Sequence, residues 1–391
     1  LHWDEVRYRE VPVDHEVLWA LMKLSRRNSA RRISFKEWTF QYNITNEVMR
    51  IMHILDSGAG GTIGSPMLGL KTSHGMDRYI VSSLMEEAIA SSQIEGAATT
   101  TKVAKDMLKT QRKPRNVSEK MILNSYVAMK QVKELRSEEM TMDLIRELHR
   151  IITHDTLQHK EHEGQFRMDD ETVVGDPFEV EKVYHQPPDH AKIESYLQEL
   201  CEFANNDGGE FIHPLIKAIV IHFMIGFIHP FVDGNGRLAR TLFYWYVLKN
   251  DYWLFEYMAI SRTIKGSRRR YGMAHLYTET DDNDLTYFLS YNFRCMEAAL
   301  HDVKEYILRK QQEQREALRT AEELPGISKR QAEILKYVIK SGRPVAIMEI
   351  ATMFDVVYQT ARTDLLGLVE TSNLDMVKDR RRLLFVEKTG G

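Results

Sequence analysis

The longest apolar run in the chain, from Ala218 to Ile228, leads directly into a turn rich in glycine and arginine. Only His222 and Gly226 interrupt this run, which is too short to span a bilayer. We therefore expect a helix buried at the centre of a mainly helical fold. A buried helix would hold the residues that follow it rigidly in place.

Residues 229–240 combine a base, a carboxylate, an anion-binding turn and two guanidinium groups. The turn Asp233-Gly234-Asn235-Gly236 precedes a run that favours a helix over Arg237–Leu248. Free N–H groups at the start of a helix bind anions, and glycine lets the backbone present them. Arg237 and Arg240 lie three residues apart, so on a helix they share a face near that end. The stretch therefore predicts a site for nucleotide phosphates.

Two further groups in this stretch suit the same site. His229 is the only one with a pKa suited to accepting a proton near neutral pH. Asp233 is a hard oxygen ligand, and one carboxylate together with phosphate oxygens is the usual way to hold Mg2+ beside a nucleotide. A turn of this composition is by itself more often structural than functional. Only the combination makes a functional interpretation the better one.

The stretch from His229 to Arg240 resembles the signature of the Fic family, His-x-Phe-x-(Asp/Glu)-Gly-Asn-Gly-Arg-x-x-Arg, at every fixed position. Members typically transfer AMP from ATP to a protein hydroxyl. The resemblance implies a protein adenylyltransferase that uses ATP and Mg2+ and modifies a Ser, Thr or Tyr of a target protein or of itself. His229 would deprotonate the hydroxyl, Phe231 would anchor the loop, and Asp233 would hold Mg2+. The positions that would bind the phosphates are Gly234, Asn235, Gly236, Arg237 and Arg240.

A second motif lies upstream. Ser91-Ser92-Gln93-Ile94-Glu95-Gly96 resembles the family's inhibitory motif, (Ser/Thr)-x-x-x-Glu-(Gly/Asn). In the family this glutamate pairs with the second arginine of the signature, here Arg240, and blocks the productive pose of the γ-phosphate. The resemblance implies autoinhibition by an N-terminal helix through Ser91, Glu95 and Gly96. The structural alternative is that Glu95 is an ordinary acid at a helix end, followed by a capping glycine.

Two further segments resemble parts of the family. Gly164-Gln165-Phe166-Arg167 matches its Gly-x-(Phe/Tyr)-Arg segment, and Val183-Tyr184-His185 precedes a proline pair as the flap does. In relatives the flap is a short hairpin that clamps the target's main chain by strand addition, so these three residues would dock the target. Acidic residues around the flap fit a solvated loop equally well. Tyr271 stands where the family has a tyrosine near the adenosine.

Composition narrows the class of protein. The chain has 391 residues, 43% of them hydrophobic, which favours two or three domains with a substantial core. The net charge of -3 gives no global signal for binding polyanions. Cys201 and Cys295 are the only cysteines, too few for a disulfide framework and suited to a reducing cytosol. Without a signal-like segment we expect a cytoplasmic protein with no membrane association.

The expected fold is mainly α, with a Fic-type helical core, a short β-hairpin flap and a C-terminal α+β winged helix. We divide the chain into an N-terminal helical region with the inhibitory helix at 1–110, a Fic catalytic core at 111–300, a helical linker at 301–325 and a winged helix-turn-helix domain at 326–391. The helices expected before the linker ends are Glu16–Arg26, Phe35–Leu55, Met76–Ala90, Ser118–Leu135, Met142–Thr153, Ile193–Asn205 and His213–Ile228, with one or two more over Asp284–Arg319.

From Ile327 onward the sequence pattern predicts short helices followed by a pair of strands. We expect a helix over Lys329–Lys340, two helices over Ile347–Phe354 and Tyr358–Glu370 separated by a short break, and a two-stranded wing over Leu374–Val386. The run from Gln359 to Leu365 resembles the recognition helix of bacterial winged-helix regulators. Residues 326–391 contain 11 basic and 8 acidic side chains, a net charge of about +3.

This basic unit leaves two interpretations open. On duplex DNA, Gln359, Thr360 and Arg362 would face bases, while Arg380, Arg381 and Arg382 would hold phosphates. Otherwise the same face would dock a protein.

Three functional hypotheses follow for the whole chain. The first is an autoinhibited adenylyltransferase, and the second is a DNA-binding transcription regulator whose Fic core senses nucleotide. The third is a Fic enzyme that transfers UMP or phosphocholine, or that removes AMP. Relatives of this arrangement often form dimers, which makes a homodimer a further expectation.

Overall fold

The computed structural model describes residues 1–59, 74–175, 183–206, 209–324, 326–371, 373–379 and 382–388, and these are mainly helical, as expected. The helices are α1 (Trp3–Val6), α2 (His15–Ser29), α3 (Asn46–Ala59), α4 (His74–Ile94), α5 (Thr101–Thr110), α6 (Val117–Glu134), α7 (Met142–Thr153), α8 (Ile193–Asn205), α9 (Pro214–Ile228), α10 (Asn235–Lys249), α11 (Ile260–Gly266), α12 (Arg268–Thr280), α13 (Thr286–Glu323), α14 (Lys329–Ser341), α15 (Ile347–Met353) and α16 (Tyr358–Glu370). The strands are β1 (Arg31–Phe35), β2 (Trp38–Tyr42), β3 (Val174–Gly175), β4 (Val183–His185), β5 (Val345–Ala346), β6 (Leu374–Asp379) and β7 (Arg382–Glu387).

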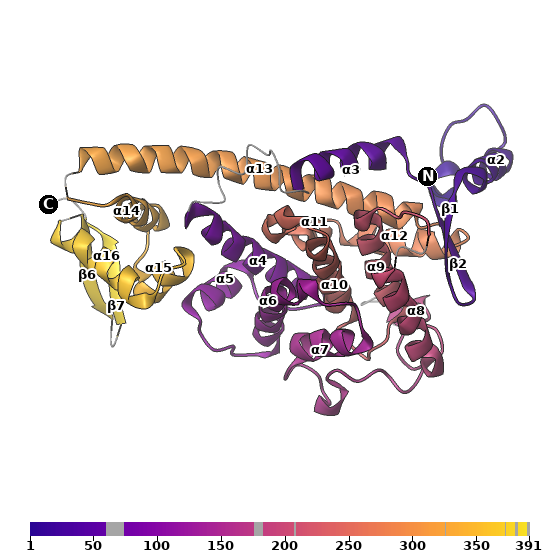
Figure 1. Ribbon diagram of the computed structural model, residues 1–391, viewed down its shortest axis with the longest axis horizontal. Helices are drawn as coiled ribbons and strands as arrows, with labels where there is room; N and C mark the ends of the chain where they lie inside the picture. Colours follow the sequence, from indigo (N-terminus) through magenta and orange to yellow (C-terminus); the bar gives the residue numbers. More distant parts are fainter. Residues whose placement is uncertain are drawn as a thin grey trace.

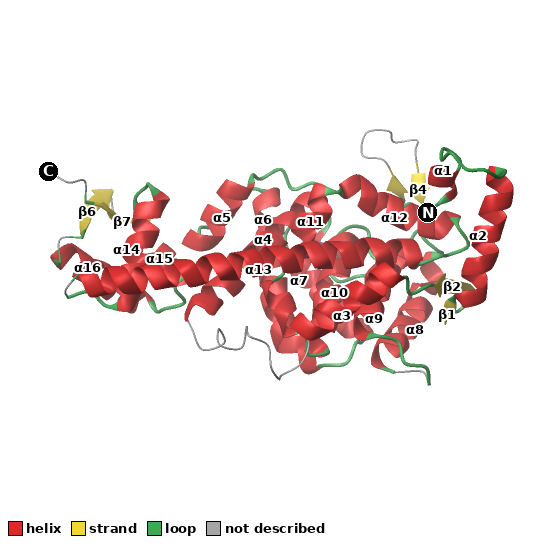
Figure 2. Ribbon diagram, turned by 90° about the horizontal axis from the view of Figure 1, so that it is seen from above, coloured by secondary structure: helices red, strands yellow, loops and turns green. Residues whose placement is uncertain are grey.

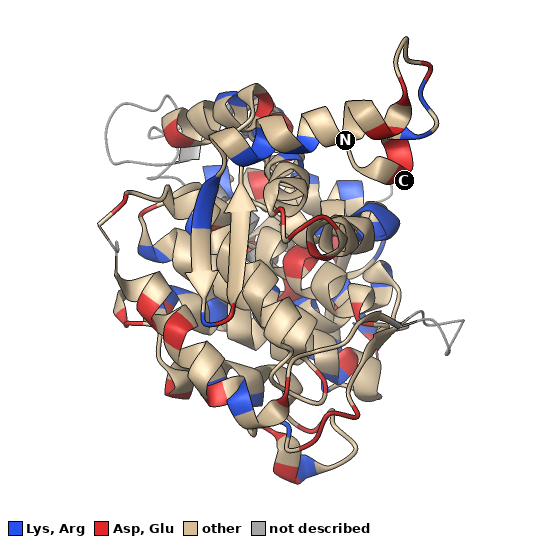
Figure 3. Cartoon of the chain, turned by 90° about the vertical axis from the view of Figure 1, so that its right-hand side faces the viewer, with Lys and Arg blue, Asp and Glu red and all other residues tan. Residues whose placement is uncertain are grey.

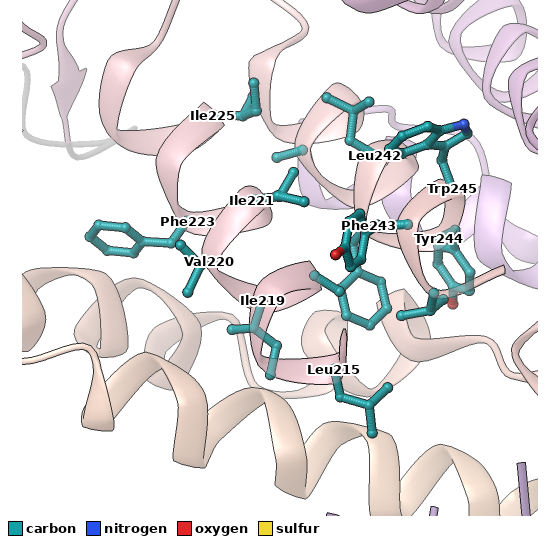
Figure 4. Close-up of a cluster of buried hydrophobic side chains, with 14 of the residues drawn as sticks. Leu215, Ile219, Val220, Ile221, Phe223, Ile225, Leu242, Phe243, Tyr244 and Trp245 are labelled. Carbon is teal, nitrogen blue, oxygen red and sulfur yellow. The ribbon is translucent and has the colours of Figure 1, made fainter. Parts of the chain in front are cut away.

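Helices α9 and α10 form the centre of the main core and pack against each other (Figure 4). Nearly every side chain of both helices is buried, which is the pattern of a helix enclosed on all sides. Pro214 at the start of α9 suits the first turn, where its missing N–H has no partner to lose. The loop between the two helices therefore starts and ends on rigid elements.

Helix α13 runs almost the whole length of the molecule, from the β1–β2 end to the C-terminal unit (Figures 1 and 2). Its first half belongs to the main core through Phe288, Phe293 and Met296. The same helix continues past residue 300 without a break and packs against α14. The sequence region expected to be a separate linker is thus the second half of one continuous helix.

The predicted helix over Phe35–Leu55 is wrong in its first half. Residues 31–42 form an antiparallel hairpin, β1 with β2, in which Phe35 pairs with Trp38 across the turn, and α3 begins only at Asn46. Buried side chains alternate with exposed ones along both strands, which is the period of a half-buried sheet and not of a helix. The edge of β2 also bonds to the start of α13, where Leu285 N–H donates to the Gln41 carbonyl at 2.8 Å.

Residues after 326 form a small unit with its own hydrophobic core. Its elements follow the order α14, β5, α15, α16, β6 and β7, and the three strands form an antiparallel sheet in the order β5–β7–β6. Helix α15 packs against α4 and α5, whereas α16 and the β6–β7 hairpin lie further from the main core (Figure 1). The unit therefore touches the helix that carries the candidate inhibitory motif.

Surface charge and membrane propensity agree with the composition. Basic and acidic segments are interspersed on the side shown in Figure 3. Among the described residues, no helix is both long enough and apolar enough to cross a bilayer. Cys201 and Cys295 are both buried free thiols.

Candidate active site

The end of α9 fixes the orientation of His229. Its N–H closes the helix on the carbonyl of Ile225 at 3.0 Å, and its backbone adopts the left-handed conformation with φ 48°. That conformation costs a residue with a side chain about 1 kcal/mol, so packing on both sides must hold it. Nδ1 lies 3.2 Å from the carbonyl of Gly226. A carbonyl can only accept, so Nδ1 donates and Nε2 carries the free lone pair.

His229 is neutral at physiological pH. Burial lowers the pKa of its imidazole to about 4, and the hydrogen bond to the Gly226 carbonyl only partly opposes this effect. A neutral imidazole with Nε2 unprotonated is the form that accepts a proton from a hydroxyl.

The loop between α9 and α10 is held by its own side chains. Asn235 closes a ring with Phe231: the Phe231 N–H donates to Oδ1 at 3.0 Å, and Nδ2 donates to the Phe231 carbonyl at 2.7 Å. The phenyl ring is fully buried. This arrangement agrees with the anchoring role implied for Phe231 and assigns Asn235 to loop structure.

Asp233 is the exposed acid of the loop. Its side chain is 60% exposed, and Oδ1 accepts from Gly234 N–H at 2.5 Å and lies 3.8 Å from Arg237 Nη2. One accessible carboxylate beside guanidinium groups fits a Mg2+ ion that takes its other ligands from nucleotide phosphates and water. Gly234 has φ +88°, and a Cβ there would collide with Thr153, so the turn requires glycine.

Arg237 is buried without enough partners. Its side chain is 1% exposed, and its Nη1 donates to the carbonyl of Ile152 at 3.1 Å. Within the described chain, Nε and Nη2 have no hydrogen-bond acceptor. Burial lowers the pKa of this guanidinium, and the charges of Asp233 and Glu95 partly restore it. A buried cation with two unused donors at the start of a helix is prepared for an anion.

Arg240 binds the candidate inhibitory motif. Its Nε donates to Ser91 Oγ at 2.9 Å, and Nη2 donates both to the Ser91 carbonyl at 3.0 Å and to Glu95 Oε1 at 2.9 Å. The structure thus brings Ser91, Glu95 and Arg240 together. Glu95 keeps a side chain that is 28% exposed but is paired with the buried Arg240, and Gly96 follows it with φ +93°, where the chain leaves α4.

Glu95 is a charged group at neutral pH. Burial raises the pKa of its carboxyl, but the charge and hydrogen bond of Arg240 outweigh this effect, so the pKa lies below its ordinary value. The carboxylate also lies against the first turn of α10, because a Cβ on Gly236 would overlap it. No side chain caps the N-terminus of α10 in the described chain. Glu95 therefore lies beside the start of α10, where the sequence predicts a site for phosphates.

Helix α4 carries a buried acid that the sequence motifs give no role. Glu87 lies one turn before Ser91 and two turns before Glu95 on the same face, and it is fully buried. It accepts hydrogen bonds from Tyr244 Oη at 2.9 Å and from the Ser261 N–H at 2.8 Å. Burial raises the pKa of this carboxyl. Glu87, Ser91 and Glu95 follow one another at intervals of four residues. This spacing is the sequence signal that α4 packs against the core through one polar face.

The expected flap is present as the antiparallel pair β3–β4, with residues 176–182 between them outside the described chain. Val183 pairs with Gly175 through the backbone, and Tyr184 is 37% exposed. The ring of His185 turns inward, with Nε2 2.7 Å from the Phe227 carbonyl and Nδ1 2.6 Å from Glu279. His185 thus fastens the flap to α9 and α12, and the implied docking role stays a prediction for its main chain.

Arg167 links the base of the flap to the loop. Its buried guanidinium donates from Nε to the His229 carbonyl at 3.0 Å and from Nη1 to Asp170 at 2.6 Å. Its own N–H donates to the Pro230 carbonyl at 2.9 Å. The resemblance pointed to this segment but gave Arg167 no role, and its contacts show a support for the His229 backbone.

Tyr271 lies on α12 with its hydroxyl 2.8 Å from His222 Nε2 and its ring 5.0 Å from that of His275. Burial raises the pKa of the phenol to about 12. The nearby charge of Arg240 acts in the opposite direction, which places Tyr271 on the same side of the site. Its contact with an adenosine stays a prediction.

The candidate nucleic-acid residues lie elsewhere. Gln359 and Arg362 are exposed and Thr360 is half-buried on α16, and Arg382 is exposed on β7. Arg380 and Arg381 lie outside the described residues. Asp364, which sequence alone places on the same helix, is buried and paired with Arg330 at 2.6 Å. The charge of Asp364 therefore does not oppose an anion at the exposed face.

The match to a protein family covers the loop and the helices around it. Residues 139–247 match the model of the Fic/DOC family. These residues are thus similar to a Fic domain. Protein adenylyltransferase Fic from Nematostella vectensis is 28% identical over 174 residues, which cover 43% of this chain and 38% of that protein. Its counterpart from Drosophila virilis is 27% identical over 183 residues, 46% of this chain and 33% of the relative. The chain is thus homologous to Fic adenylyltransferases over well under half of their length.

Two solved structures share the fold of this chain. A Fic family protein from Desulfovibrio desulfuricans superposes with a TM-score of 0.56 at 16% identity, covering 90% of this chain and 98% of that one. A Fic domain containing signaling protein from Bacteroides thetaiotaomicron gives a TM-score of 0.50 at 18% identity, over 66% of this chain and 97% of its own. These similarities support the fold, and they give no information on the activity.

Proposed function

We propose that the protein is an adenylyltransferase that moves AMP from ATP to a hydroxyl of a protein and that is inhibited by its own Glu95. The observation that carries this proposal is the buried guanidinium of Arg237, whose Nε and Nη2 lack acceptors within the described chain. It lies beside an accessible carboxylate, Asp233, on the loop that starts at the neutral base His229. A group that binds phosphate, a ligand for a metal ion and a base are together what a transfer reaction at phosphorus requires.

The reaction follows from these groups. His229 Nε2 takes the proton of the target hydroxyl, and the hydroxyl oxygen forms a bond to the α-phosphorus of ATP. The bond from that phosphorus to the oxygen bridging to the β-phosphorus breaks, and pyrophosphate leaves. Arg237 and the first-turn N–H groups of α10 bind the phosphates and stabilise the developing charge. Mg2+ held by Asp233 would neutralise the charge on the phosphates when it is bound.

Inhibition follows from where Glu95 lies. Its carboxylate occupies Arg240 and the space over Gly236, which the resemblance assigns to the γ-phosphate. The Glu95 carboxylate and the γ-phosphate cannot both occupy that position. While Glu95 is paired with Arg240, ATP would therefore bind only with its γ-phosphate elsewhere. Release of Glu95 would free Arg240 for the phosphate.

Mass spectrometry of intact protein tests the proposal. The Glu95→Gly variant, incubated with ATP, Mg2+ and a mixture of candidate proteins, is expected to add the mass of one AMP per modified hydroxyl, on itself or on a target. An unchanged mass for every protein, with ATP binding demonstrated, would reject AMP transfer and favour nucleotide sensing.

The pH dependence of AMP transfer follows from the buried base. The pKa of His229 is lowered to about 4, and removal of Glu95 takes away a charge that raises it. The neutral, active form therefore persists as the pH falls through about 6.5, where an exposed histidine would gain a proton. We expect the transfer rate of Glu95→Gly to stay level from about pH 8 to about pH 5. A rate that halves near pH 6.5, with the protein still folded, would contradict this.

A second candidate function belongs to the C-terminal unit. We propose that residues 326–388 form a winged helix and bind duplex DNA through α16, since Gln359 and Arg362 are exposed there and Arg382 is exposed on the hairpin. The pairing of Asp364 with Arg330 removes an unfavourable charge from that face. A protein partner remains the alternative.

Fluorescence anisotropy with a pool of duplex DNA tests this candidate. Arg382→Ala is expected to weaken binding and to reduce its salt dependence by about one released counterion, whereas Arg362→Ala is expected to weaken binding and to relax the choice of bases. The control is Lys340→Ala, which removes a positive charge from α14 and leaves α16 and the β6–β7 hairpin unchanged. Equal binding by all variants would assign the face to another partner.

A further inference from the structure

His149 on α7 packs against the loop between α9 and α10. It is fully buried, and its ring stacks on that of Phe231 with 3.6 Å between centroids and 4° between planes. Neither the sequence motifs nor the reaction assigned it a role. Its position under the anchoring phenyl ring puts it in contact with the loop that carries Asp233.

Both ring nitrogens of His149 have defined partners. The N–H of Gly164 points to Nδ1 at 3.0 Å, so Nδ1 is the acceptor and carries no proton. Nε2 lies 2.8 Å from the main-chain carbonyl of Asp233, so it is the donor. Only the neutral form with its proton on Nε2 satisfies both contacts. The ring therefore connects the Gly164 turn to the backbone of the candidate metal ligand.

The loop also presses onto α7 next to this contact. A Cβ on Gly234 would meet Thr153 and the Nε2 atom of His149, so the Asp233–Gly234 peptide lies flat against the helix. The carboxylate of Asp233, in contrast, is largely exposed. The side chain that would hold a metal is thus open to a ligand, and its position depends on a backbone to which His149 donates a hydrogen bond.

We propose that His149 is a positioning residue that fixes the Asp233 main chain so that its carboxylate meets Mg2+ bound to the nucleotide. The proposal rests on the proposed function, because it takes Asp233 as the metal ligand. His149 touches neither nucleotide nor metal and acts through one donated hydrogen bond. Partners of this kind, one step removed from a ligand, typically change metal affinity or activity about 10- to 100-fold when they are lost.

Two amide substitutions separate the two nitrogens. In His149→Asn the side-chain oxygen takes the place of Nδ1 and keeps the acceptor for Gly164, but nothing reaches the Asp233 carbonyl. In His149→Gln the side-chain N–H reaches the place of Nε2 and keeps the bond to Asp233. Both variants lose the aromatic stack on Phe231, so loss of packing is matched between them.

Calorimetry of ATP binding across a range of Mg2+ concentrations measures the effect without catalysis. The double variant Glu95→Gly/His229→Ala, which has an open phosphate site and no base, serves as the inert background, and Asp233→Ala in that background defines complete loss of the Mg2+ effect. His149→Asn is expected to raise the Mg2+ concentration needed for half-maximal tightening by about 10-fold, and His149→Gln by less than about 3-fold. Equal Mg2+ dependence for the two would overturn the proposal.

A further substitution tests the proposal if His149→Asn does not fold. If thermal melts show that His149→Asn is unfolded, His149→Phe keeps the stack on Phe231 and lacks both hydrogen bonds, and it is expected to show the same 10-fold shift. Unchanged Mg2+ dependence in a folded His149→Phe would equally overturn the proposal. AMP transfer by Glu95→Gly is measured separately, so an absence of transfer rejects the proposed function while the binding data still decide the role of His149.

Discussion

Replacing Glu95 by glycine is expected to raise the rate of AMP transfer about 10- to 100-fold. The substitution removes the hydrogen bond of 2.9 Å to Arg240 and opens the space over Gly236. A charged hydrogen bond of this kind is worth about 1.5 to 3 kcal/mol, and each 1.4 kcal/mol is about tenfold in rate or population. The measurement is the initial rate of label incorporation from α-labelled ATP at saturating Mg2+.

The control for this prediction is another glutamate of the same helix. Glu86 lies on α4 but pairs with Lys105 and Arg262 away from Arg240, so Glu86→Gln is expected to leave the rate within about twofold of the parent. Equal rates for the parent and Glu95→Gly, with both proteins folded and binding ATP, would show that the Glu95–Arg240 pair does not inhibit.

Replacing His229 by alanine in the Glu95→Gly background is expected to lower AMP transfer by about 10²- to 10⁴-fold, the usual loss when a positioned base is removed. Affinity for ATP should hardly change, because the imidazole binds the Gly226 carbonyl and not the phosphate groups of the site. The measurement pairs single-turnover transfer rates with ATP binding by calorimetry.

An exposed histidine outside the site provides the matched control for His229. His159→Ala should transfer AMP at the rate of its Glu95→Gly parent, since that side chain is 67% exposed and contacts Glu161 and the ring of His162, both outside the site. A fall in transfer by His229→Ala that merely follows a fall in ATP affinity would assign this histidine to nucleotide binding and remove it as the base.

The central part of the fold was predictable because its signals are local and strong. An apolar run that ends at a glycine-rich turn predicts a buried helix followed by an anion site, and α9, the loop and α10 have that form. The pairing of Glu95 with Arg240 joins residues 145 positions apart, and no periodicity in the sequence predicts such a contact. It was anticipated only through resemblance to a family.

The parts that sequence did not predict depend on tertiary context. The aromatic residues from Phe35 to Tyr42 also fit the apolar face of a helix, whereas the sheet period of two is the better signal. His149 looks like any polar residue on the buried face of α7, and only the fold brings it under Phe231. Glu87 is similar: its burial reflects the docking of α4 on α10 and α11.

The most direct test of AMP transfer compares two labels on one donor. Glu95→Gly is incubated with Mg2+ and ATP labelled at either the α- or the γ-phosphorus, and protein is then denatured and counted. Transfer of AMP predicts that the α-label stays on protein while the γ-label leaves with pyrophosphate, and that His229→Ala abolishes the α-signal. Retention of the γ-label, or of neither label despite ATP binding, would contradict the proposed reaction.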